Sequence, residues 1–118
     1  MKPVSTGELI PINNNSNIFI YNETIVVNPE QTDKDNNISV DFGIVNATSE
    51  KITIIEVNPH CSCTGYELEE EYILPYDTTF LNLKVSLEQL KMLKKTYATI
   101  KIDHEKKYLL ARIKLDDE

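Results

Sequence analysis

Short runs of alternating or β-branched apolar residues constrain the fold of this chain more than any other feature. In residues 38–44 every second residue is bulky and apolar, which is the period of a half-buried strand. Similar runs occupy residues 18–21, 24–27, 52–57, 80–85, 97–102 and 108–115. Turn residues separate them at intervals of roughly 8 to 12 residues, which is typical of sandwiches. The pattern predicts an antiparallel β-sandwich of about seven strands.

One segment has helical spacing instead. Leu87, Leu90 and Leu93 recur at near-helical intervals, and Ser86 is followed three residues later by Gln89, as in a capping box. These residues predict one short helix near residues 87–94. The polar residues 103–107 predict a hairpin loop between the last two strands.

The composition fits a single soluble domain. The chain has 118 residues, of which 41% are hydrophobic and 26% are charged, and this is enough for one core. A net charge of -7 argues against nucleic acid as a partner, which would need a clustered basic surface, and against docking on anionic lipid. No apolar run reaches the roughly 20 residues that span a bilayer, so we expect no direct membrane insertion by this segment.

The first residues differ from the rest in composition. Residues 1–17 contain Pro3, Gly7, Pro11 and an asparagine cluster, all typical of loops. We therefore predict a flexible N-terminal arm over residues 1–17, which Leu9 and Ile10 could attach to the body, and a sandwich domain over residues 18–118.

Cys61 and Cys63, the only cysteines of the chain, follow the strand predicted at residues 52–57. On a regular strand, residues i and i+2 lie about 7 Å apart, at the upper limit for a disulfide, and a turn at Ser62 would bring them closer. A disulfide that closes so short a loop adds little stability through chain entropy. The two residues are a candidate thiol pair or disulfide, and three interpretations stay open: a local structural clip, a redox site and a metal site.

A metal site here would need more ligands. His60 and the two cysteines make three soft donors of the kind that Cu(I) favours. Adjacent residues on a strand point in opposite directions, however, and structural zinc prefers four ligands at wider spacing. A cysteine nucleophile needs a base within reach, and the second histidine, His104, falls in a distant loop. We predict no metal, no cofactor and no enzymatic activity.

Tyrosines and glutamates interleave after the cysteines. Residues 67–71 read as an acidic loop, and their spacing is not that of an ordered calcium loop. His60, Tyr66, Tyr72 and Tyr76 form a candidate interaction loop at one end of the sandwich. A carbohydrate-binding surface would need an exposed aromatic platform, and the absence of tryptophan weighs against it.

Several motifs together resemble a known family. In chain order they are Phe42 and Asn46 in a strand and turn, the strand at residues 52–57, Cys61-Ser62-Cys63-Thr64, and Ile73-Leu74-Pro75. This order is similar to a bacterial domain family of unknown function with an immunoglobulin-like, Hydin-type fold, over about residues 24–115. Ser62, Tyr76 and the pair Ala47-Thr48 stand where that family usually has glycine, and a non-glycine residue resists positive φ.

The resemblance implies an immunoglobulin-like sandwich that bacteria of the Bacteroides kind export as a lipoprotein or periplasmic protein. It also implies a signal segment, with a lipid anchor, upstream of Met1, and it brings no enzymatic activity. We therefore expect a non-enzymatic binding or structural module of the bacterial cell envelope with a protein partner. One alternative is a thiol-dependent periplasmic redox partner or Cu(I) carrier that uses Cys61 and Cys63. A carbohydrate-binding module is the second alternative.

Overall fold

The computed structural model describes residues 9–13 and 15–116. These residues form ten strands and one helix: β1 (Leu9–Pro11), β2 (Ile18–Tyr21), β3 (Thr24–Val27), β4 (Asn37–Asn46), β5 (Ile52–Pro59), β6 (Thr64–Leu68), β7 (Tyr72–Ile73), β8 (Asp77–Ser86), α1 (Leu87–Leu93), β9 (Lys95–Ile102) and β10 (Tyr108–Leu115). Each of the seven predicted runs lies in a strand.

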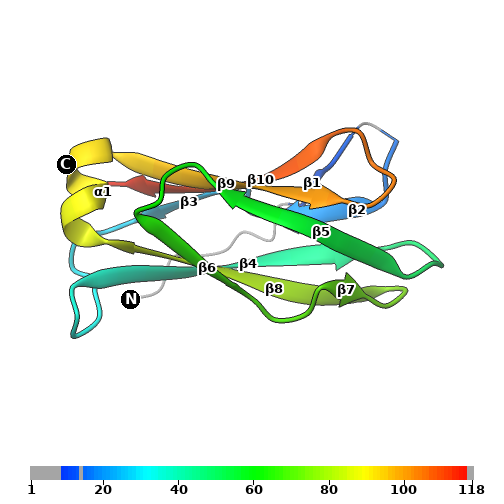
Figure 1. Ribbon diagram of the computed structural model, residues 1–118, viewed down its shortest axis with the longest axis horizontal. Coiled ribbons are helices and arrows are strands. Elements are labelled where there is room, and N and C mark those ends of the chain that lie inside the picture. Colours follow the sequence, from blue (N-terminus) through cyan, green and yellow to red (C-terminus); the bar gives the residue numbers. More distant parts are fainter. Residues whose placement is uncertain (1–8, 14, 117–118) are drawn as a thin grey trace.

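Two five-stranded sheets pack face to face, as Figure 1 shows. The first sheet has the order β1-β2-β4-β8-β6, and the second has the order β3-β10-β9-β5-β7. Neighbouring strands run antiparallel except β3 and β10, which are parallel. The chain passes from the first sheet to the second at Asn22, which has a φ of 53°. The predicted immunoglobulin-like β-sandwich is confirmed.

The core lies between the two sheets. Strands β4 and β8 pair over ten residues each, and their alternation places one face of each strand inside. Phe42 and Ile44 of β4 are fully buried there, as are Leu81 and Leu83 of β8. The opposite face of the same strands carries mostly polar residues, together with Gly43, Val45 and Phe80, so burial follows the period-two pattern of the sequence over most of both strands.

Helix α1 closes one end of the sandwich. The Ser86 side chain accepts a hydrogen bond from the Gln89 backbone N–H at 3.1 Å, and this caps the helix. Leu87 and Leu90 are buried against the ends of the strands, and Lys94 ends the helix with a φ of 69°. The predicted short helix is confirmed. In the described part of the chain no helix is long and apolar enough to cross a membrane.

The predicted N-terminal arm lies partly outside the described residues, which begin at Leu9 and omit residue 14. Within it, β1 pairs with β2, and the Ile12 backbone N–H donates to the Ile18 carbonyl oxygen at 2.9 Å. Ile12 is also buried. Residues 9–11 are thus the edge strand of the first sheet, and the buried side chain of Ile12 attaches the segment after it to the core.

The acidic loop predicted for residues 67–71 needs correction. Glu67 lies inside strand β6, and only residues 69–71 form the connection to β7. Thr64 and Leu68 turn toward the interior while Glu67 faces solvent, so the glutamate belongs to the polar side of a short strand. The sequence of residues 67–71 contains four glutamates, and this composition made the segment resemble a loop although its first residues alternate as in a strand.

Only one of the positions where the resemblance leads us to expect glycine has a positive φ. Tyr76 has a φ of 60° in the turn that the Asp77 backbone N–H closes onto the Leu74 carbonyl oxygen at 3.1 Å. Ser62, Ala47 and Thr48 have no positive φ. The missing glycine therefore costs backbone strain only at Tyr76.

Replacing Tyr76 by glycine is expected to raise the free energy of unfolding by about 0.5–1 kcal/mol, because glycine adopts positive φ without steric cost. The Tyr76 side chain is 73% exposed, so little packing is lost. Thermal unfolding measures the change. Tyr76→Ala is the control, since it keeps Cβ at the same φ and should bring no gain. A lower melting temperature for Tyr76→Gly than for the wild type would contradict the inference that the backbone is strained at Tyr76.

Candidate functional site

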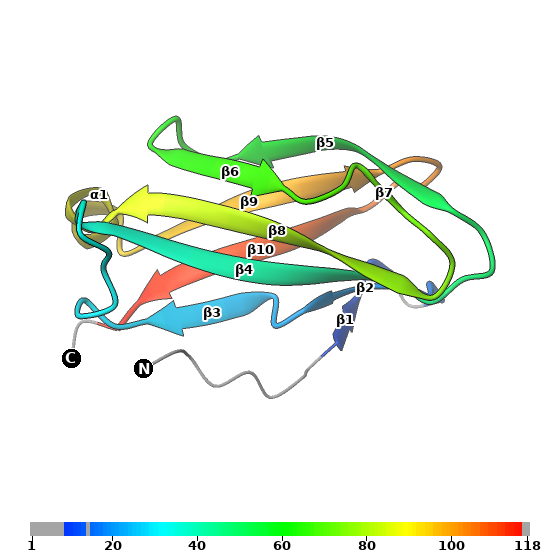
Figure 2. The ribbon, with the colours of Figure 1, turned by 90° about the horizontal axis from the view of Figure 1, so that it is seen from below.

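The two cysteines lie where the chain crosses from one sheet to the other. Strand β5 ends at Pro59 in the second sheet, and β6 begins at Thr64 in the first. The four residues between them form the connection seen at the upper left of Figure 2. Within it, the Sγ atoms of Cys61 and Cys63 form a disulfide. We call residues 60–64 the cysteine turn.

A turn brings the two cysteines together. The Thr64 backbone N–H donates to the Cys61 carbonyl oxygen at 3.0 Å, and the two cysteine Cα atoms are 5.2 Å apart. This separation is shorter than the roughly 7 Å of a regular strand and falls in the ordinary range for a disulfide. Both cysteines are half-buried, and Ser62 between them is exposed. The disulfide is thus at the surface of the molecule.

Strand β9 of the second sheet contacts the cysteine turn. The His60 backbone N–H donates to the Tyr97 carbonyl oxygen at 2.8 Å, and the two rings stack with centroids 4.5 Å apart. The Thr64 and Thr96 hydroxyl oxygens are 2.7 Å apart, and both side chains are buried. Cys63 packs against the core. The turn is therefore attached to the body by contacts that do not involve the disulfide.

The candidate interaction loop is not one cluster in space. His60 belongs to the cysteine turn, and Tyr66 lies in β6 opposite Leu83. Tyr76 instead precedes the first residue of β8, at the other end of that ten-residue strand. Tyr72 lies in β7, where its ring faces the Lys51 ammonium group at 5.2 Å. Strand β6 runs antiparallel to β8 and so carries the chain away from the cysteines, which the sequence alone did not reveal.

The described side chains do not assemble a metal centre. No group of three or more His, Cys, Asp or Glu in this part of the chain could hold an ion. The disulfide occupies both cysteine sulfurs, so neither is a thiolate ligand while the bond stands. The His104 side chain is 91% exposed beside Asp103. A Cu(I) site at Cys61 and Cys63 would first require reduction of the disulfide.

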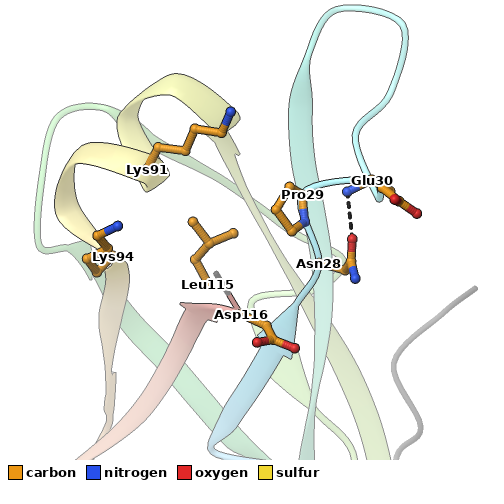
Figure 3. A pocket seen from close by; sticks show the side chains of 7 residues that line it. All are labelled: Asn28, Pro29, Glu30, Lys91, Lys94, Leu115 and Asp116. Atoms are coloured by element: carbon orange, nitrogen blue, oxygen red, sulfur yellow. Dashed lines mark hydrogen bonds between the residues drawn. The ribbon is translucent and has the colours of Figure 1, made fainter. Parts of the chain in front are cut away.

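A surface depression of about 470 Å³ lies beside α1 (Figure 3). Its lining consists of Asn28, Pro29, Glu30, Lys91, Lys94, Leu115 and Asp116. Two lysines and two carboxylates there carry opposite charges, and the Glu30 backbone N–H is satisfied by the Asn28 side chain at 2.8 Å. The lining contains no histidine, cysteine or hydroxyl side chain.

Among residues 9–13 and 15–116, no strand pairs with the outer side of β6, and sequence reasoning missed this open edge. The Glu69 backbone N–H donates to the Phe80 carbonyl oxygen at 3.0 Å, directly across the ladder. Hydrogen-bonded pairs alternate along antiparallel strands, so Gly65 and Glu67 also bond to β8. The backbone N–H groups of Tyr66 and Leu68 therefore point away from β8. The alternation of residues 64–68 was the available signal for this strand.

The adjacent strand of the other sheet is open as well. Strand β7 pairs with β5 only at Ile52 and Thr53, and Ile54 makes one further bond to Glu71. In the described part of the chain no strand pairs with residues 55–59 of β5 on that side, and Ile55 is 51% exposed. We call strand β6 and residues 55–59 together the open side. Both lie along the same flank of the sandwich in Figure 2, with the cysteine turn joining them.

Comparison with known proteins supports the fold. The solved structure of a protein of unknown function from Porphyromonas gingivalis W83 is similar to this one, with a TM-score of 0.63 at 13% sequence identity. The similarity covers 84% of this chain and 46% of that protein, so the chain spans about half of its length. No curated protein matches the chain. A family model described as "Protein of unknown function (DUF1573)" matches residues 20–116. The chain therefore belongs to the DUF1573 family.

Proposed function

We propose that this domain is a non-enzymatic module of the bacterial cell envelope that binds a partner protein along strand β6. The observation that supports this is the outer edge of β6, which no other described strand pairs with and where the backbone N–H groups of Tyr66 and Leu68 point away from the sheet. An open edge is a template for a further strand, and many binding domains take up an extended peptide in this way.

The side chains around the open side indicate the chemistry of the partner. Glu67 is exposed on strand β6, and three more glutamates follow at residues 69–71. Tyr66, which is 49% exposed, adds an apolar surface beside them. The partner segment is therefore extended and basic, with lysine or arginine opposite the glutamates and apolar residues near Tyr66 and Ile55.

The envelope location has two independent supports. Disulfides persist in oxidising compartments such as the bacterial periplasm, and Cys61 and Cys63 are joined. The resemblance of the chain to exported bacterial domains points to the same compartment. Export followed by assembly with a partner on the open side accounts for both the disulfide and the unpaired edge.

Proline at residue 66 tests the binding edge. Peptides selected on the wild-type domain from a random displayed library should slow hydrogen exchange of the Tyr66 and Leu68 amides, as measured by NMR. Tyr66→Pro removes an N–H group that β8 does not use, so the variant should fold and bind these peptides at least tenfold more weakly. Peptides enriched in lysine and arginine are expected.

Val26→Pro is the matched control. Backbone N–H groups of β10 and of the residue after it donate to the carbonyl oxygens of Glu23 and Val27. The backbone groups of Val26, between them, therefore point away from β10, at the edge of the second sheet. Val26 is exposed like Tyr66. Its proline variant should bind the selected peptides as the wild type does. Equal weakening in both variants, or peptides that leave the Tyr66 and Leu68 amides unchanged, would contradict the proposal.

A further inference from the structure

We propose that the Cys61–Cys63 disulfide is a reversible thiol–disulfide exchange site that accepts electrons from a dithiol protein, with Thr64 as a positioning residue. The inference is independent of binding at strand β6. It follows from three features of the cysteine turn: its attachment to the body without the disulfide, a hydrogen-bond donor at each sulfur, and its place at the surface.

The fold does not depend on this bond. The disulfide joins residues two positions apart, and closing so short a loop removes little entropy from the unfolded chain. The bond from Thr64 to the Cys61 carbonyl oxygen, the contact of His60 with Tyr97 and the threonine pair hold the turn independently. After reduction the two sulfurs therefore stay close enough to form the bond again.

Each sulfur has a donor that would stabilise its thiolate. The Cys63 backbone N–H lies 3.0 Å from Cys61 Sγ. The Thr64 hydroxyl oxygen lies 3.8 Å from Cys63 Sγ and 2.7 Å from the Thr96 hydroxyl. When Thr96 donates to Thr64, the Thr64 proton is directed to Cys63. Hydrogen bonds to the charged form favour it, so both thiolates are better leaving groups than an unassisted thiolate.

The exchange proceeds in two balanced steps. A thiolate of the partner dithiol attacks Cys61 Sγ, forms an intermolecular disulfide and breaks the Cys61–Cys63 bond, and Cys63 leaves as a thiolate beside Thr64. The second thiolate of the partner then attacks its own first sulfur, forms the partner's disulfide and releases the Cys61 thiolate beside the Cys63 N–H. Two electrons pass from the partner to this domain, and its thiolates take up the two protons that the partner thiols lost.

Equilibration with mixtures of reduced and oxidised glutathione tests the site in the wild-type protein. Samples are quenched with acid and alkylated, and their mass is measured by mass spectrometry. The folded domain should change from disulfide to dithiol as the share of reduced glutathione rises. Circular dichroism should stay native throughout. A disulfide that persists in the folded protein under excess reduced glutathione, and opens only in guanidinium chloride, would overturn the proposal.

Threonine variants separate the role of Thr64 in exchange from its role in packing. Thr64→Val keeps the shape but removes the donor to Cys63, and the equilibrium constant for reduction should fall about tenfold, which is about 30 mV. Thr64→Ser should restore it. Thr96→Val breaks the same buried hydroxyl pair, but it leaves the Thr64 proton free to bond to Cys63. This variant should therefore lower the free energy of unfolding and change the equilibrium constant for reduction by less than about twofold. An equal shift in Thr64→Val and Thr96→Val would overturn the role of Thr64.

Single-cysteine variants test the order of attack. Cys63 packs against the core, so Cys63→Ser, which leaves Cys61, should form a mixed disulfide with glutathione disulfide at least about tenfold faster than Cys61→Ser. Because the short loop adds little stability, both variants should unfold near the wild-type temperature. Equal rates, or faster reaction of Cys61→Ser, would overturn the assignment of Cys61 as the attacked sulfur.

Discussion

Replacing Asn46 by aspartate is expected to lower the free energy of unfolding by about 3–5 kcal/mol, out of the roughly 5–15 kcal/mol typical of a domain. Asn46, the last residue of β4, is fully buried. Its Nδ2 donates to the backbone carbonyl oxygens of Glu50 at 2.7 Å, Ile73 at 2.9 Å and Leu74 at 3.1 Å. A carboxylate cannot donate, so Asn46→Asp sets a buried charge against three acceptors. Urea denaturation at pH 7 measures the loss.

Lower pH should recover part of this loss. Burial beside carbonyl oxygens raises the pKa of the introduced carboxyl above its unfolded value of about 3.9. The variant therefore loses stability as the pH rises above that value and regains it as the pH falls, because the protonated carboxyl is neutral and donates one bond. Asn58→Asp is the control, since Asn58 is exposed on β5 and the change should stay within about 0.5 kcal/mol. Equal losses at both positions would contradict the role of Asn46.

Replacing Phe42 by alanine is expected to cost about 3–5 kcal/mol of unfolding free energy. The Phe42 side chain is completely buried between the sheets, opposite Leu81 on the neighbouring strand. Alanine loses the transfer free energy of the ring and leaves a cavity that two hydrogen-bonded sheets cannot close. Urea denaturation measures the change, and Phe42→Leu should lose less because it fills more of the space.

Phe80→Ala is the matched control for this substitution. Phe80 lies on the rung next to Phe42, opposite Gly43, but on the outer face of the first sheet, where it is 48% exposed. There its ring covers Gly43 together with Tyr21. We expect a loss of about 1 kcal/mol for Phe80→Ala. A loss as large as that of Phe42→Ala would mean that the outer face, and not the space between the sheets, carries the packing energy.

Much of the fold was predictable because its signals are local. The alternation in residues 38–44 identified both the strand and its buried face, since successive side chains on a strand point to opposite sides. Ser86 marked the start of α1 because its hydroxyl reaches the backbone N–H three residues later, within the same turn. Neither inference required knowledge of any distant segment.

The short strands escaped prediction for the opposite reason. Strand β1 has three residues and β7 has two, and each is stabilised mainly by pairing with a neighbour. In β6 the alternation covers only five residues and runs into three further glutamates, so the register with β8 is what identifies the strand. The residues of the candidate interaction loop do not lie together for the same reason, because β6 separates His60 from Tyr76 along the sandwich.

By itself the sequence determined which residues face inward, where α1 begins and that the two cysteines follow a strand, because these properties depend on neighbours a few positions apart. Only the tertiary structure decided that β6 is an edge, that Asn46 meets carbonyl groups from a segment 27 and 28 residues away, and that Thr64 links the cysteine turn to Thr96. Sheet pairing joins segments that are distant in the chain, and it is this pairing that creates an open side and places a hydroxyl pair behind a disulfide.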